Sequence, residues 1–146
     1  MRGLSARVTS NTDEIDFVDR FIPPVKDLNM QVLKLHFNER RGRCRKLGVQ
    51  ERRIAITENI IYDALISGHI PLVVTNALFC EKENLPDWVV ITGIDKRFVY
   101  INNPLDVNSR MGKLALSALQ KVIGYRGKQS MVEVWKQNKC ALTEKS

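Results

Sequence analysis

The chain has 146 residues, and its 44% hydrophobic and 27% charged residues are ordinary values for one soluble globular domain. No apolar run approaches the roughly 20 residues of a membrane span, and the N-terminus lacks the apolar core of a secretory signal. We therefore expect a cytoplasmic protein that makes no use of a membrane. Its 23 Lys and Arg residues against 16 Asp and Glu residues give a net charge of +7, which favours acidic partners or nucleic acid.

Three cysteines, Cys44, Cys80 and Cys140, lie far apart in the sequence and form no C-x-x-C pair. An odd number at this spacing indicates neither a disulfide framework nor a zinc site. We expect reduced thiols, no metal and no cofactor.

The N-terminal third predicts a short strand over 4–9 and a long helix over 24–47 that begins after a pair of prolines. Apolar residues recur on one face of this helix at a spacing near 3.6, which predicts a face turned toward the core: Met30, Leu33, Phe37, Cys44 and Leu47. Cys44 is interpreted as a small core residue. A short strand is expected over 53–56.

A second helix is expected over 58–67, with Thr57 as its N-cap and Gly68 as its stop. Its apolar stripe is Ile61, Ala64 and Leu65. A buried strand over 70–75 and a loop over 77–85 follow. Beyond the middle of the chain, 114–123 is predicted to be helical and 130–135 to be an alternating strand.

The most informative segment lies between Pro86 and Pro104. Residues 88–94 and 98–101 are rich in β-branched and aromatic residues, and the polar residues 95–97 separate them, as in a β-hairpin. We predict an α+β fold in which a mostly antiparallel sheet of strands 70–75, 88–94, 98–101 and 131–135 packs against the helix of 24–47. One domain is expected over 1–135, with a polar tail over 136–146.

This hairpin resembles the strand pair of papain-like cysteine peptidases of the bacteriocin-processing type, the double-glycine leader peptidases of family thirty-nine. In those enzymes a Pro-His-Trp-Val-Val-x-Thr-Gly strand carries the catalytic His, and a following Tyr-x-x-Asp-Pro carries the acid that orients it. The resemblance implies a papain-like half-fold. It places Asp87 at the His position and Asn103 at the Asp position, so the triad is degenerate.

The resemblance also implies an early helix that carries a nucleophilic Cys, and the chain is expected to correspond to the C-terminal two-thirds of such a domain. Cys44 on its apolar face and Cys140 in the tail do not fit that role. Cys80 is a cleft candidate in the loop before the hairpin, with His69 as a remote alternative base. His36 lies in the first helix.

Each residue of the hairpin also has a simpler interpretation. Asp87 is most simply a solvated turn residue, and otherwise a cleft carboxylate able to bind a cation or a basic peptide. Asn103 could still orient an imidazole, as Asn does in some papain-like sites. Trp88 and Tyr100 are interpreted as core or cross-strand partners, with ligand stacking as the alternative.

Much of the excess positive charge is concentrated in one segment, which we call the basic patch: Arg40, Arg41, Arg43, Arg45, Lys46, Arg52 and Arg53. Such a run is either a solvated face or a binding surface.

Three functions remain open from the sequence. The favoured one is a catalytically inert peptidase-like domain that binds a peptide or protein, possibly acidic, through the old substrate cleft. The alternatives are a thiol peptidase completed by a separate Cys-bearing chain, and a basic nucleic-acid-binding protein, which lacks any known recognition motif. A homo-oligomer is also expected, through a sheet face around Leu72–Val74 and Val89–Ile91 left without cover.

Overall fold

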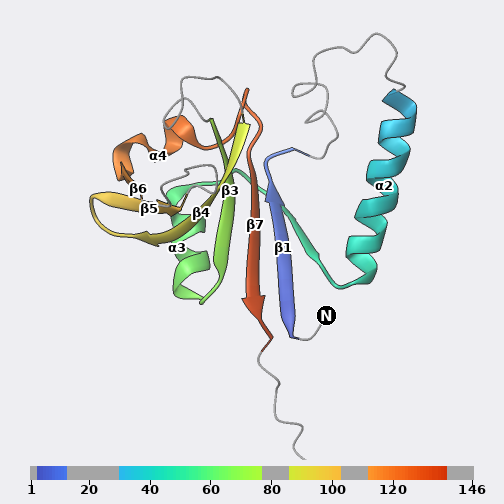
Figure 1. The fold of residues 1–146 in the computed structure, drawn as a ribbon, viewed down its shortest axis with the longest axis horizontal. Helices are drawn as coiled ribbons and strands as arrows, with labels where there is room; N and C mark the ends of the chain where they lie inside the picture. Colours follow the sequence, from blue (N-terminus) through green and yellow to red (C-terminus); the bar gives the residue numbers. More distant parts are fainter. Residues whose placement is uncertain (1–2, 13–29, 77–85, 103–111, 138–146) are drawn as a thin grey trace, which may run out of the picture.

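A computed structural model describes residues 3–12, 30–76, 86–102 and 112–137. In these ranges the chain forms seven strands and three helices, and the predicted α+β fold is confirmed (Figure 1). The strands are β1 (Leu4–Ser10), β2 (Gln50–Arg53), β3 (Ile70–Asn76), β4 (Pro86–Ile94), β5 (Phe98–Asn102), β6 (Gly112–Ala115) and β7 (Ser130–Lys136). The helices are α2 (Met30–Lys46), α3 (Glu58–Ile66) and α4 (Leu116–Val122).

All seven strands belong to one sheet in the order β2-β1-β7-β3-β4-β5-β6. The pair β1 and β2 is parallel, and every other neighbouring pair is antiparallel. Strand β7, near the end of the chain, thus lies between the first strand and β3. The sheet is mostly antiparallel, as the sequence predicted.

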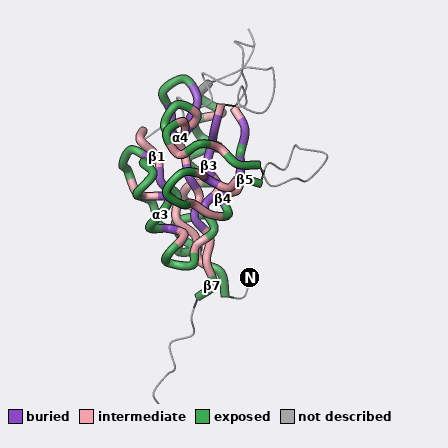
Figure 2. The backbone as a smooth tube through the Cα atoms, turned by 90° about the vertical axis from the view of Figure 1, so that its left-hand side faces the viewer, coloured by how far each residue is buried: buried purple, intermediate pink, exposed green. Residues whose placement is uncertain are grey.

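The two faces of the sheet differ in what covers them. Along β4, Asp87, Val89 and Ile91 are buried, whereas Trp88 and Thr92 are exposed. The buried set faces α3 and α4, and with residues of these helices and neighbouring strands it forms the core: Ile56, Ile61, Val73, Val89, Ile91, Val99, Ile101, Leu119, Ile123 and Met131. We call this side of the sheet the inner face and the opposite side the outer face. The buried stretches follow the central strands in Figure 2.

Helix α3 has the predicted ends. The Thr57 hydroxyl accepts a hydrogen bond from the Ile60 N–H, which satisfies one of the donors left open at a helix start. After the helix, Gly68 adopts a φ of 75°, a conformation that glycine reaches without steric cost. The side chains of Ile61 and Ala64, both in α3, are buried, and Ile61 packs in the core, so α3 covers part of the inner face.

The long helix differs from its prediction. Residues 24–29 lie outside the described ranges, and α2 stands beside the sheet near β1 instead of packing across it (Figure 1). Cys44 is exposed, so its interpretation as a core residue is wrong. Phe37 and Leu47 on the same stripe are 38% and 79% exposed. The apolar periodicity predicts the helix correctly, but the apolar side chains of this stripe are not buried against the described residues.

Two boundaries also differ. The helix expected over 114–123 is split, because residues 112–115 pair with β5 as an edge strand and the helix begins only at Leu116. The short strand expected over 53–56 lies three residues earlier, as β2. Ile56 instead enters the core, where its N–H donates to Gln129 Oε1 at 2.8 Å.

Candidate functional site

The turn of the β4–β5 hairpin is fixed by a single carboxylate. Asp95 Oδ1 accepts hydrogen bonds from the N–H groups of Arg97 and Phe98 at 2.7 and 2.8 Å, and Oδ2 accepts from the Tyr100 hydroxyl at 2.8 Å. The Arg97 N–H, then the Tyr100 hydroxyl and the Phe98 N–H, lower the pKa of Asp95. The same bond to Asp95 raises the pKa of Tyr100. Tyr100 is therefore held as a structural partner of the turn.

Asp87 is the residue that the hairpin resemblance places at the catalytic His position. It pairs with Thr75 in the β3–β4 register, and the Thr75 hydroxyl donates to its backbone carbonyl at 3.4 Å. The side chain is on the inner face and the residue is only 8% exposed. The interpretation of Asp87 as a solvated turn residue is therefore wrong.

One oxygen of this carboxylate has no hydrogen-bond partner among the described residues. Asp87 Oδ2 is buried and forms no hydrogen bond within the structure described. A buried acceptor left without a partner costs about 1–3 kcal/mol, and more when it is charged. Native proteins retain few such groups, and each calls for an explanation.

The remaining residues of the predicted site are placed only in part. Trp88 is 39% exposed on the outer face, opposite Val74 in the register, so it points away from Asp87. Cys80 and Asn103 lie outside the described residues. The structure therefore brings together neither a thiol and a base nor a base and an orienting amide in the ranges that it covers.

A second polar cluster, not predicted from the sequence, lies on the inner face over β2, β1, β7 and β3. At its centre Glu133 has a side chain only 2% exposed. Its carboxylate accepts from Arg52 Nη2 at 3.2 Å, lies 2.9 Å from His69 Nδ1 and is 3.6 Å from Arg7 Nη1. The charge of Glu133 is thus balanced by two guanidinium groups.

Aromatic contacts complete the Glu133 cluster. The ring of His69 stacks on Trp135 with centroids 4.3 Å apart, and the Arg7 guanidinium lies over the same indole at 5.6 Å. His69 precedes β3, whereas Asp87 pairs with the far end of that strand. Six residues of strand span about 20 Å, so His69 and Asp87 belong to separate sites.

The basic patch is partly neutralised by acids close to it. Arg41 makes a bidentate pair with Glu51, and Arg45 binds the same carboxylate at 2.6 Å. Hydrogen bonds from Arg41 and Arg45 lower the pKa of Glu51 to about 2. Arg43 pairs with Glu39, and Arg52 belongs to the Glu133 cluster. The two pairs with Glu51 fasten the C-terminal end of α2 to β2, and all these pairs together leave less open positive charge than the sequence suggested.

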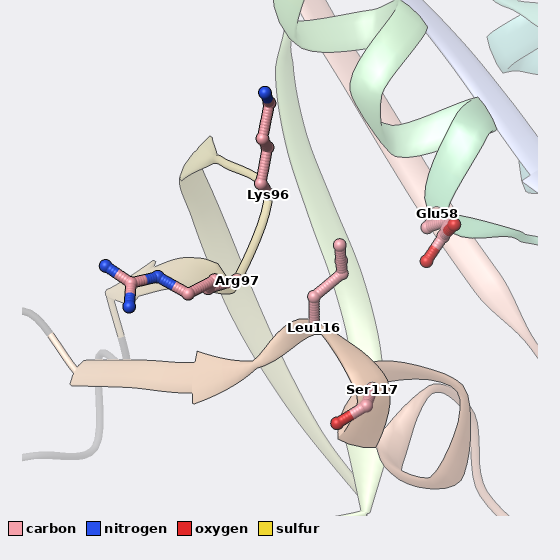
Figure 3. A pocket seen from close by; sticks show the side chains of 5 residues that line it. All are labelled: Glu58, Lys96, Arg97, Leu116 and Ser117. Carbon is pink, nitrogen blue, oxygen red and sulfur yellow. The ribbon is translucent and has the colours of Figure 1, made fainter.

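A shallow hollow of about 440 Å³ lies between the β4–β5 turn and the starts of α3 and α4 (Figure 3). It is lined by Glu58, Lys96, Arg97, Leu116 and Ser117. The cationic ends of Lys96 and Arg97 point away from each other in Figure 3, so they do not converge on one ligand. We assign no chemistry to this hollow.

No group of three or more His, Cys, Asp or Glu side chains in the described ranges is arranged to hold a metal ion. Nor does any helix described in the structure combine the length and apolarity needed to cross a lipid bilayer.

The family to which this chain is similar agrees with the hairpin and the fold. The model of the Peptidase_C39 like family matches residues 1–140, almost the whole chain. The chain belongs to this family. No curated protein and no solved structure shows significant similarity to it. The resemblance noted at the β4–β5 hairpin therefore extends along the chain, and the fold is that of a peptidase-like domain.

Proposed function

We propose that this member of the Peptidase_C39 like family is catalytically inert and binds a peptide or a partner protein where active relatives hold their substrate. The observation that carries the proposal is Asp87. The resemblance places it at the position of the catalytic His, and the structure places it on the inner face of β4 with one buried oxygen unpaired. A carboxylate is a far weaker base than an imidazole and has little drive to remove a thiol proton at neutral pH.

The unpaired oxygen supports a binding role for this position. Its burial without a partner costs stability, and a ligand that supplies an N–H or a cationic group would remove that cost. A peptide offers such donors along its backbone and in Lys and Arg side chains. Asp87 would then act as an acceptor for the bound peptide and not as a base.

The experiment is a binding titration of the full chain with a fluorescein-labelled peptide library, followed by fluorescence anisotropy. We expect Asp87→Ala to weaken the best peptide by about tenfold or more, because a hydrogen bond to a charged group contributes about 1.5–3 kcal/mol. The matched control is Asp63→Ala, which removes an exposed carboxylate on α3 and should leave the affinity unchanged.

Thermal melting of both variants accompanies the titration. The melting temperature of Asp87→Ala should be no lower than that of the unaltered chain, because the substitution removes a carboxylate with an unsatisfied oxygen. Equal peptide affinity in Asp87→Ala and the unaltered chain would refute the role of Asp87.

A further inference from the structure

The outer face of the sheet is apolar across four adjacent strands. The register places these side chains on one side: Leu4, Ala6 and Val8 of β1, Val132 and Val134 of β7, Ile70, Leu72 and Val74 of β3, and Trp88 and Val90 of β4. Val74 is fully buried, so the open part of this face lies around the other members. Leu4 is 58% exposed, Ile70 55% and Trp88 39%. At about 3.3 Å per residue and 4.8 Å per strand, this face covers on the order of 400 Å² in plan.

A second uncovered apolar surface lies on α2. Its stripe consists of Leu33, Phe37 and Cys44 with Leu47 just past the helix end, Arg40 interrupts it between Phe37 and Cys44, and of the four apolar residues only Leu33 is partly buried. The spacing of four, seven and three residues keeps these side chains on one side of the helix. The stripe is about 20 Å long, close to the length of the strands on the outer face.

The two surfaces cannot cover each other fully within one chain. Arg41 and Arg45 hold the C-terminal end of α2 to Glu51 on β2, at one edge of the sheet. Four strand spacings, about 19 Å, separate β2 from β4, whereas a helix is about 10 Å across. A helix fastened at β2 therefore leaves Ile70 and Trp88 uncovered.

We propose that two copies of this chain form a symmetric dimer in which α2 of each copy packs on the outer face of the other. Each partner contributes one helix stripe and one sheet face, the self-complementary pairing that a two-fold axis requires. The sheet face and the stripe together present roughly 600 Å² in plan, and accessible area exceeds plan area. A standard stable interface buries about 800 Å² per partner. The combined area approaches this value, whereas the area of the sheet face alone does not.

The choice of a second copy also follows from the chemistry of the two surfaces. The register places no acidic side chain on the outer face between β1 and β4. The one charged side chain that the register places there, among the described residues, is Lys136 at the end of β7, so association depends on apolar contact. The dimer does not depend on the function proposed for Asp87, which lies on the inner face.

Sedimentation equilibrium at about 20 µM tests the dimer directly. The expected mass is twice the 16.7 kDa of the chain. Phe37→Glu on α2 and Ile70→Glu on β3 should each raise the dissociation constant at least about tenfold, because each places a charge in an apolar contact. Tyr62→Glu alters an exposed residue of α3 beneath the inner face and should have no effect.

A crosslinking experiment distinguishes the proposed pairing from other dimers. In a background with Cys80→Ala and Cys140→Ala, Ile70→Cys supplies a thiol on the outer face, and Cys44 supplies one on α2. A short bis-maleimide should then link two chains, whereas Tyr62→Cys in the same background should not. A monomeric chain at 20 µM overturns the proposal, and so does a dimer that Ile70→Glu weakens and Phe37→Glu does not. Circular dichroism melts establish that each variant is folded.

Discussion

Replacing Glu133 by Gln is expected to lower the free energy of unfolding by about 3 kcal/mol or more, because it removes one partner of a buried ion cluster. Glu133 is almost fully enclosed and is the acid that balances Arg7 and Arg52 on the inner face. Glutamine preserves the shape of the side chain and part of its hydrogen bonding. The two guanidinium groups then lose their counter-charge. The side chains of Arg7 and Arg52 are 27% and 34% exposed, so neither is fully solvated.

Urea unfolding followed by tryptophan fluorescence measures this effect, since Trp135 lies within the cluster. The matched control is Glu39→Gln, which breaks the exposed pair between Glu39 and Arg43 and should cost less than about 1 kcal/mol. A loss below 1 kcal/mol for Glu133→Gln would mean that the cluster contributes no more than a surface ion pair.

Gly124→Ala is expected to destabilise the fold by at least about 2 kcal/mol. Gly124 has a φ of 85°, which costs an L-residue about 1–2 kcal/mol. A Cβ at this position would also lie 2.4 Å from the carbonyl oxygen of Lys128, a backbone atom that cannot swing aside. The N–H of Gly124 donates to Val74 at 2.7 Å and fixes the segment against β3, so the strain has no easy release.

The control for this change is Gly42→Ala in α2. No atom lies within 4 Å of the Cβ that it would add, and alanine is favoured over glycine in a helix by about 0.5–1 kcal/mol. The melting temperature and the urea concentration at half-unfolding should therefore fall for Gly124→Ala and rise for Gly42→Ala. If Gly124→Ala unfolds at the same urea concentration as the unaltered chain, the tight turn before β7 is not as constrained as the geometry indicates.

Local patterns were sufficient for most of the elements. The Thr57 cap and the Gly68 stop defined α3, and the β-branched runs on either side of Asp95 defined the hairpin. Pairings between distant segments were not predictable in this way. Nothing local indicates that β7 lies between β1 and β3, or that β2 runs parallel to β1.

The candidate site shows the same limit. The resemblance located Asp87, but its burial follows from the register with Thr75 and from the cover on the inner face. The Glu133 cluster was missed because its members come from three strands, β1, β2 and β7, and from the residue before β3, and these segments are far apart in the sequence. One signal was present, since Glu133 lies between Met131 and Trp135 on the side of β7 that alternation assigns to the core.

The account depends most on the proposal that this chain has no peptidase activity. The direct measurement is hydrolysis of fluorogenic peptides, including ones that end in a double-glycine motif, by the full chain at high enzyme concentration with and without a thiol alkylating agent. We predict no turnover above buffer in either case, and none from Asp87→His or Cys80→Ala. Turnover by the unaltered chain that the alkylating agent abolishes would contradict the account, because it would show a working thiol site in a chain proposed to carry Asp87 in place of the catalytic His.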